Sequence, residues 1–231
     1  MRLGLIVPSS NTALEMEIKI MAPNDISIHW ARTPLTIATL DSMKKAEESA
    51  EESAEMLSHA DVDLICYGCT SASIFGWRHE KLLIRKIENV SGKPTVTADT
   101  SVIQALKELN AKSISIVTPY IEEVNLGEKA FFAENGFKVK NVNGMGIPDN
   151  LLVGRKDPKI AYNLVKKIDS NDVDTILISC TNLNSVKHIE ELEKDLGKPI
   201  ISSNSAILWA MLKKIKYDNP VNGFGRLLAS L

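Results

Sequence analysis

Two stretches of the chain repeat one another: Asp61-Val-Asp-Leu-Ile-Cys-Tyr-Gly-Cys-Thr70 and Asp172-Val-Asp-Thr-Ile-Leu-Ile-Ser-Cys-Thr181. They share six identities in ten positions and align without a gap from the first aspartate to the final threonine. Each is an apolar run that ends in small polar residues, which is typical of a buried strand in a parallel sheet. The repeat indicates that the chain contains two copies of one structural unit.

The match continues on both sides of these stretches. Upstream, Leu3–Pro8 has a counterpart at Ile114–Pro119, with the same offset that separates the two cysteine stretches. Downstream, Gly-Lys-Pro occurs at Gly92–Pro94 and at Gly197–Pro199, each time before a short apolar run. Each unit therefore spans about 110 residues, which is an ordinary size for a small domain.

Apolar and β-branched runs predict four strands in each unit. They cover Leu3–Val7, Ile26–Ala31, Val62–Tyr67 and Thr95–Thr97 in the first unit, and Ser113–Thr118, Lys138–Val142, Thr175–Ser179 and Ile200–Ser202 in the second. Helical periods lie between them, such as one apolar stripe from Met43 to Leu57. This alternation predicts an α/β fold of two pseudosymmetric Rossmann-like lobes, each a roughly four-stranded parallel sheet flanked by helices. Ligands would bind between the lobes, where strand C-termini meet.

The composition is that of an ordinary globular protein. Of 231 residues, 44% are hydrophobic and 24% are charged, and the net charge is -2. Because there is no basic field and no apolar run long enough to span a bilayer, we expect neither nucleic acid nor a membrane as a partner. Three cysteines are an odd number, which argues against a secreted disulfide framework. We therefore expect a soluble, cytoplasmic protein.

Cys69 and Cys180 occupy the same position in the two units, where a buried strand ends and small hydroxyl residues begin a helix. A thiol there lies near the positive end of the helix dipole, which lowers its pKa and favours the thiolate. The backbone N–H groups of the same turn can hold a carboxylate. Two such thiols on facing lobes would approach one small anion from opposite sides. The alternative is that both are ordinary buried core cysteines.

The remaining cysteine and the histidines suggest no further chemistry. Cys66 lies three residues before Cys69, but it falls inside the predicted strand and has Leu177 as its counterpart, so we expect a buried structural thiol rather than a redox pair. The four histidines show no paired metal-ligand spacing, and neither unit carries a phosphate-binding glycine motif. We expect no metal and no cofactor.

Three further polar residues are candidates for a binding site. Asn11 lies in the loop Pro8-Ser-Ser-Asn-Thr12 after the first strand, and Tyr120 lies in the equivalent loop of the second unit. Asn150 lies in the turn-rich segment Gly146-Ile-Pro-Asp-Asn150. Each could donate a hydrogen bond to a carboxylate. Each also has an ordinary explanation, as a helix cap, a surface tyrosine or a turn residue.

The motifs together resemble those of the maleate cis-trans isomerases, which belong to the aspartate/glutamate racemase superfamily with the arylmalonate decarboxylases. The resemblance covers nearly the whole chain. The segments that carry it are Val7-Pro-Ser-Ser-Asn-Thr12 with Glu15 and Glu17, Tyr67-Gly-Cys-Thr-Ser71, Thr118-Pro-Tyr-Ile-Glu-Glu-Val-Asn125, Ile178-Ser-Cys-Thr181 and Gly197-Lys-Pro-Ile-Ile-Ser-Ser-Asn204, with Trp209.

This resemblance implies cofactor-independent conversion of maleate, or a similar small dicarboxylate, into its trans isomer. The resemblance implies that Cys69 is the nucleophile that adds to the alkene and that Cys180 is a proton donor or acceptor. The family's carboxylate-binding residues fall on Asn11, Tyr120 and, less directly, Asn150. Backbone amides of Thr70, Ser71, Thr181 and Asn182 would complete the cradle for the developing negative charge.

The resemblance also implies a domain organisation and an assembly. By the superfamily pattern, the helix after the last strand crosses back onto the first lobe. The N-terminal lobe would then comprise residues 1–97 plus 205–231, and the C-terminal lobe residues 98–204. Relatives of this kind suggest a homodimer.

Three alternatives stay open. Arylmalonate decarboxylases resemble the chain around Tyr120–Asn125 but keep only the second cysteine, so Cys69 argues against decarboxylation. The segment Ser71–Trp77, however, resembles the decarboxylases more than the isomerases. Amino-acid racemases use both cysteines as a two-base pair, but their first loop is glycine-rich. The same layout could also serve a small-anion binding protein without turnover.

Overall fold

The computed structural model describes residues 1–70 and 74–231, and it contains two four-stranded parallel sheets. In the first sheet the strand order is β2-β1-β3-β4, and in the second it is β6-β5-β7-β8. The strands are β1 (Arg2–Pro8), β2 (Ser27–Thr33), β3 (Leu64–Tyr67), β4 (Thr95–Thr97), β5 (Ser113–Thr118), β6 (Lys138–Gly144), β7 (Thr175–Ile178) and β8 (Ile200–Ser202). The predicted α/β class and both parallel sheets are confirmed.

The two sheets share their register as well as their order. Ile6 pairs with Tyr67 in the first sheet, and the residues that the repeat aligns with them, Val117 and Ile178, pair with each other in the second. The inner strands β3 and β7 are buried along their whole length. That burial explains why their sequences are continuous apolar runs rather than alternating ones.

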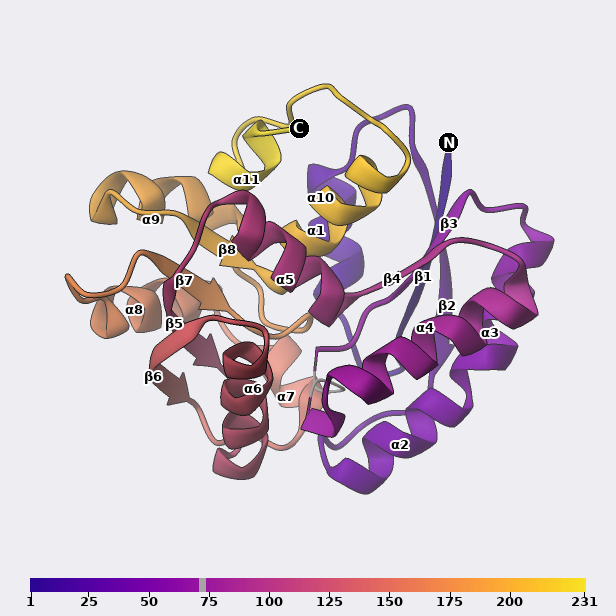
Figure 1. Cartoon of the computed structure of the whole chain (residues 1–231), viewed down its shortest axis with the longest axis horizontal. Helices are drawn as coiled ribbons and strands as arrows, with labels where there is room; N and C mark the ends of the chain where they lie inside the picture. The colour runs from indigo at the N-terminus through magenta and orange to yellow at the C-terminus, as the bar shows by residue number, and fades with distance from the viewer. Residues whose placement is uncertain (71–73) are drawn as a thin grey trace.

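Helices cover both sheets (Figure 1). They are α1 (Leu14–Met21), α2 (Leu40–Glu48), α3 (Ala50–His59), α4 (Trp77–Ser91), α5 (Ala98–Glu108), α6 (Glu122–Glu134), α7 (Asn150–Gly154), α8 (Lys159–Ile168), α9 (Ile189–Leu196), α10 (Ser203–Lys214) and α11 (Arg226–Ala229), with a short 3₁₀ turn at Val186–His188.

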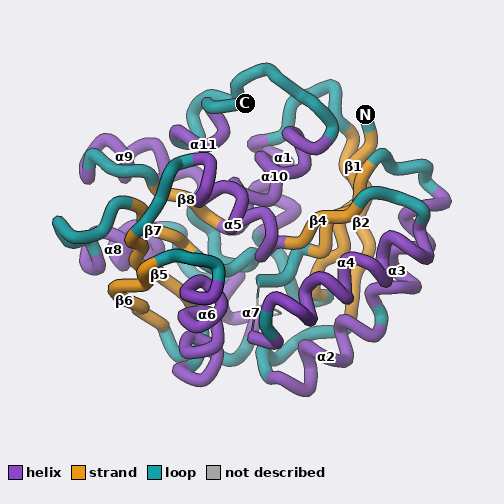
Figure 2. The backbone as a smooth tube through the Cα atoms, viewed as in Figure 1, coloured by secondary structure: helices purple, strands orange, loops and turns teal. Residues whose placement is uncertain are grey.

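Helices α5 and α10 pack against each other in the middle of the molecule, between the two groups of strands (Figure 2). Each begins at a capping box, formed by Thr97 with Thr100 and by Ser202 with Ser205. Although α10 follows the last strand of the second unit, it also contacts α1 and β3 of the first. The part of α10 from Ser203 to Leu212 is buried without interruption. This helix therefore ties the two units into one structure.

The structure corrects two helical predictions. The single helix expected from Met43 to Leu57 is broken at Ser49, where α2 ends and α3 begins. The helix expected directly after Cys180 is replaced by turns and the 3₁₀ segment, which precede α9. Here the side chains of Asn182 and Asn184 bond to backbone groups elsewhere, which competes with helix formation. After Cys69, the first α-helix among the described residues is α4.

None of the helices within residues 1–70 and 74–231 is long and apolar enough to cross a membrane.

Candidate functional site

Cys69 and Cys180 lie inside the protein, beyond the ends of the two inner strands. Each follows its strand by two positions, and they are only 6% and 3% exposed. Burial raises the pKa of Tyr120 well above its usual value, and the proximity of Cys180 and Cys69, whose ionised forms would repel a phenolate, contributes to the same effect. Both thiols therefore lie near a single phenol. The structure brings together the two repeated cysteines and the tyrosine that the sequence motifs indicated.

Tyr120 connects the two halves of this site. Its hydroxyl lies 2.8 Å from Oγ1 of Thr70, the residue after Cys69. Its side chain also forms a hydrogen bond with the thiol of Cys180. Tyr120 is buried and comes from the loop that follows β5. This position excludes the alternative of an ordinary surface tyrosine.

The residues at the two repeated cysteines, Cys69–Thr70 and Cys180–Asn182, are called the first and second cysteine turns. Asn11 joins the loop after β1 to the second cysteine turn. Its Nδ2 donates to Oγ1 of Thr181 at 3.0 Å, and the Thr181 hydroxyl donates to the carbonyl of Gly68 at 3.1 Å. Its Oδ1 accepts the backbone N–H groups of Ala13 and Leu14 at the start of α1. Asn11 is therefore both a helix cap, which is its ordinary explanation, and a buried contact between the units.

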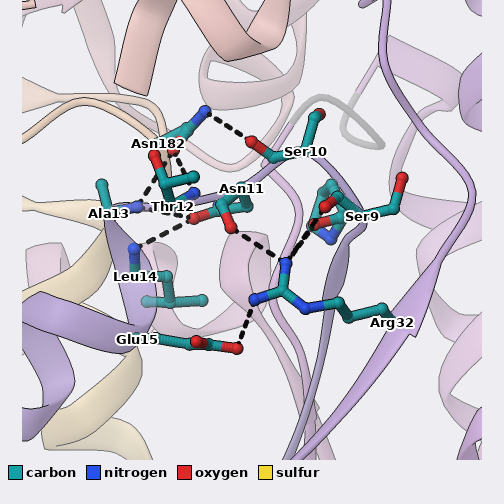
Figure 3. Close-up of polar contacts among 10 residues, drawn as sticks. Ser9, Ser10, Asn11, Thr12, Ala13, Leu14, Glu15, Arg32 and Asn182 are labelled. Carbon is teal, nitrogen blue, oxygen red and sulfur yellow. Dashed lines mark hydrogen bonds and ion pairs between the residues drawn. The ribbon is translucent and has the colours of Figure 1, made fainter. Parts of the chain in front are cut away.

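Asn182 and Asn150 extend the same network, and Figure 3 shows Asn182 against the first loop. Oδ1 of Asn182 accepts the backbone N–H groups of Thr12 and Ala13, at 2.8 and 3.1 Å. Its Nδ2 donates to the carbonyl of Asn150 at 2.6 Å, and Nδ2 of Asn150 donates to Oγ of Ser10 at 2.8 Å. Asn150 thus belongs to the same contact between the units, although it meets the loop hydroxyl rather than a thiol.

The structure describes three of the four residues whose backbone amides were predicted to hold the developing negative charge. The backbone N–H of Asn182 points at Sγ of Cys180 at 3.3 Å, which is the arrangement expected of a group that stabilises a thiolate. Thr70 and Thr181 are buried beside the cysteines. Ser71 lies outside the described residues.

The expected lowering of the Cys180 pKa is wrong. Burial raises the pKa of this thiol to about 11, although hydrogen bonds from Tyr120 and from the backbone N–H of Asn182 act in the opposite direction. Removal of a thiolate from water outweighs these two donors, and the turns that follow Cys180 supply no α-helix dipole. At neutral pH Cys180 is therefore a protonated thiol. Burial likewise raises the pKa of Cys66, which lies within β3 as predicted for a structural thiol.

Arg32 supports the first loop in a way that sequence patterns did not indicate. Its guanidinium donates to the carbonyls of Ser9 and Asn11 and forms an ion pair of 2.5 Å with Glu15 (Figure 3). These contacts hold the loop backbone in addition to those of Asn182. Arg32 carries no motif, because the contact arises only where β2 pairs with β1 beside the loop.

Buried carboxyl groups are the second feature to which sequence reasoning assigned no role. Glu17 and Glu128 are both buried, on α1 and α6. The repeat aligns them with each other, because their offset is that of the two cysteines. Glu17 accepts backbone N–H groups of Ser185 and Val186 and the side-chain amide of Asn204. Extending the repeat from motifs to single polar positions would have found this pair.

Comparison with known proteins agrees with this architecture. The sequence profile of the arylmalonate decarboxylase family matches residues 3–228. The chain is 30% identical to a maleate isomerase of Pseudomonas putida over 99% of its length and 97% of the relative's. It is 27% identical to an arylmalonate decarboxylase of Bordetella bronchiseptica, over 97% of this chain and 95% of the relative.

Solved structures give the same picture. The crystal structure of a cysteine-to-alanine variant of the Pseudomonas putida S16 maleate isomerase with maleate superposes with a TM-score of 0.95 at 28% identity, over 100% of this chain and 98% of that one. The match therefore extends across both sheets and the helices between them. The chain belongs to the arylmalonate decarboxylase and maleate isomerase family.

Proposed function

We propose that the protein converts maleate, or a closely similar small dicarboxylate, into its trans isomer without a cofactor. The Cys69 thiolate adds to one alkene carbon, forming a C–S bond while the π pair moves into the adjacent carboxylate. Rotation about the resulting single bond follows. The pair then re-forms the double bond and expels the thiolate, so the reaction consumes and releases nothing.

The observation that carries this proposal is the position of Tyr120 between the two cysteine turns. Its hydroxyl contacts Thr70 beside Cys69 and the thiol of Cys180. A donor there can hold a carboxylate oxygen on which charge develops after thiolate addition, in a site from which water is excluded. The resemblance of the whole chain to maleate isomerases supports the same substrate class.

The protonation state of Cys180 supports its role as the proton donor. A thiol with a pKa of about 11 keeps its proton at neutral pH and can give it to the enediolate-like carbon. The same sulfur takes that proton back before elimination. Cys69 is then the nucleophile, as the family resemblance implies, and substrate carboxylates would lie against Asn11, Tyr120, Asn150 and the amides of Thr70, Ser71, Thr181 and Asn182.

Substrate has to enter a site whose side chains are now packed together. Cys69, Tyr120 and Cys180 are each at most 6% exposed. We therefore propose that the cysteine turns separate to admit a dicarboxylate and close again over it. Closure would keep water from the covalent intermediate.

Arylmalonate decarboxylation is the second candidate, because the matching family profile carries that description. Loss of carbon dioxide from a malonate also develops an enediolate that the same donors could hold. Decarboxylation needs only the second cysteine as proton donor. The presence of Cys69 at the equivalent position of the first unit favours isomerisation.

Proton NMR of the protein with maleate tests the proposal directly. Wild-type protein is expected to produce fumarate, and Cys69→Ser and Cys180→Ser are each expected to abolish it. Cys66→Ala is the matched control, because this third thiol is buried within β3 rather than in a cysteine turn. If wild-type protein forms no fumarate from maleate but releases carbon dioxide from phenylmalonate, the isomerase proposal is wrong and the protein is a decarboxylase.

A further inference from the structure

Glu17 lies in the first unit, yet it accepts three hydrogen bonds from the second. Its Oε1 accepts the backbone N–H of Ser185 at 2.5 Å and that of Val186 at 2.9 Å. Its Oε2 accepts Nδ2 of Asn204 at 2.6 Å. Glu17 is on α1 and is 4% exposed. A buried carboxyl group of one unit therefore holds the backbone of the other.

The backbone that Glu17 holds leads out of the second cysteine turn. Ser185 precedes the 3₁₀ turn Val186–His188, and the first N–H groups of a helical turn have no acceptor within that turn. Glu17 supplies the acceptor from another element, as the side chain of an N-cap residue does in an ordinary helix. An ionised carboxylate suits this place, because its two oxygens only accept hydrogen bonds and three donors point at them.

Asn204 extends this contact into the second cysteine turn itself. Its Nδ2 donates to Glu17 and also to the carbonyl oxygen of Thr181, at 3.2 Å. Asn204 is the second residue of α10 and is completely buried. The two contacts fix the orientation of its amide group, because the reverse orientation would turn Oδ1 toward a carboxylate and a carbonyl, neither of which can donate.

The peptide group between Thr181 and Asn182 carries the contact to the thiol. Its carbonyl oxygen accepts Nδ2 of Asn204, and its N–H points at Sγ of Cys180 at 3.3 Å. A trans peptide is planar and its C=O and N–H point in opposite directions, so a donor that holds the carbonyl also directs the N–H. Donation to the carbonyl further polarises the peptide and strengthens its N–H as a donor.

We propose that Glu17 is a positioning residue for Cys180. It orients the amide of Asn204, which holds the peptide between Thr181 and Asn182 with its N–H directed at the sulfur. These contacts are called the Glu17 chain. Its effect on the thiol does not depend on any substrate. Its effect on turnover rests on the proposed function, in which Cys180 becomes a thiolate after it gives up its proton and the directed N–H stabilises that thiolate.

The electrostatics of both ends of the chain agree with this geometry. Burial raises the pKa of Cys180, and the N–H of Asn182 is one of the donors that act against burial. Burial also raises the pKa of Glu17, whereas the hydrogen bonds from Ser185, Val186 and Asn204 lower it. A buried carboxyl group needs such donors to stay ionised, so the contacts that position the turn also favour the charged form of Glu17.

The rate at which iodoacetamide alkylates Cys180, followed by mass spectrometry at a fixed pH, tests the Glu17 chain without substrate. Glu17→Gln keeps one acceptor oxygen but turns an NH₂ group toward Asn204, so the chain breaks. Because the pKa of Cys180 should then rise, its alkylation should slow by about three- to tenfold relative to that of Cys69 in the same sample. A merely structural role predicts the opposite, since a loosened turn exposes the thiol and speeds the reaction.

Glu193→Gln is the matched control. Glu193 is also buried and accepts two backbone N–H groups, from Ile200 at 3.0 Å and from Arg226 at 2.8 Å. Ile200 begins β8, so this contact lies at the opposite end of the sheet from the cysteine turns. The variant should lose stability in urea, as Glu17→Gln does, but leave the alkylation of Cys180 unchanged. A similar slowing in both variants would overturn the proposal.

Asn204→Ala breaks the same chain without a change in α1, so it tests the proposal even if Glu17→Gln does not fold. It should slow the alkylation of Cys180 to the same extent. The double variant should slow it no further than either single substitution, because both remove one chain of contacts. Additive effects would show that the two residues act independently. Alkylation at or above the wild-type rate in the folded variants would likewise overturn the proposal.

Turnover of maleate separates this proposal from the proposed function. Glu17→Gln should lower turnover by about tenfold, the effect of losing one hydrogen bond to an ionised group, whereas Glu193→Gln should not. If alkylation of Cys180 slows as expected but wild-type protein forms no fumarate, the Glu17 chain stands and the proposed function fails. If wild-type protein forms fumarate but alkylation slows in neither Glu17→Gln nor Asn204→Ala, the Glu17 chain is wrong and the proposed function stands.

Discussion

The side-chain amide of Asn11 donates to the hydroxyl of Thr181 at 3.0 Å, and so connects the loop after β1 to the residue that follows Cys180. The two residues are 170 positions apart in the chain. The same asparagine caps α1 through its Oδ1. One side chain therefore both begins a helix of the first unit and positions the cysteine turn of the second.

Substitution of Asn11 should separate these two roles. Asn11→Ala loses the cap and the contact with Thr181, so we expect a loss of about 1–3 kcal/mol in unfolding free energy, measured in urea. Asn11→Asp keeps a capping oxygen and should lose less stability, yet it removes the donor and should lower turnover as much as alanine does. Equal activity of Asn11→Asp and wild type would show that the amide donor is dispensable.

Tyr120→Phe tests the donor between the two cysteine turns. The Tyr120 hydrogen bond lowers the Cys180 pKa against the effect of burial, so its loss should raise that pKa further. Alkylation of Cys180, followed against pH by mass spectrometry, should slow. Turnover should fall by about 10²-fold if the hydroxyl also holds the developing negative charge. Tyr162→Phe is the control, because that hydroxyl bonds to the exposed Asp195; a similar loss there would point to a general effect.

The burial of Glu80 should make the unfolding free energy depend on pH, and this effect does not involve Cys69 or Cys180. Burial raises the pKa of Glu80 to about 7, although a hydrogen bond from Thr97 acts in the opposite direction. The folded protein should therefore lose stability as pH rises from about 4.5 through 7. Glu80→Gln removes this ionisation and should be more stable than wild type at pH 8 by about 1–3 kcal/mol. No difference between them at pH 8 would mean that Glu80 ionises without cost.

Gly127 is a case where packing should reverse a helical preference. Replacement of a mid-helix glycine by alanine normally stabilises a protein by about 0.5–1 kcal/mol. At Gly127, however, a Cβ would lie 2.5 Å from Cγ2 of Ile74 and 3.2 Å from its Cα. Backbone cannot move aside as easily as a flexible side chain, so Gly127→Ala should lower the melting temperature. A rise would show that the segment at Ile74 can shift without cost.

The strands of this protein could be predicted from its sequence because the repeat supplies each of them twice. An apolar run such as Leu64–Tyr67 is ambiguous alone, but its copy at Thr175–Ile178 fixes both its type and its place in the sheet. The break at Ser49 could not be predicted, because the apolar stripe from Met43 to Leu57 continues across it. Only contacts with neighbouring elements decide where such a helix turns.

The candidate site, like the fold, could be predicted from the sequence only in part. Motifs indicated Cys69, Tyr120 and Cys180, and the structure brings them together. They could not give the pKa of Cys180, which depends on how completely the folded protein excludes water from that thiol. Glu128 also carried no motif. Its burial and its hydrogen bond from Ser179 arise only where α6 meets the residue that follows β7.

The position of α10 has a consequence for fragments of the chain. This helix belongs by sequence to the second unit, yet it contacts α1 and β3 of the first. A polypeptide ending after the first unit would leave those surfaces uncovered and expose apolar side chains to water. Such a fragment is expected to aggregate, or to bind the equivalent helix of another molecule by domain swapping. Co-expression of the two halves should restore a folded complex only when α10 stays attached to the second half.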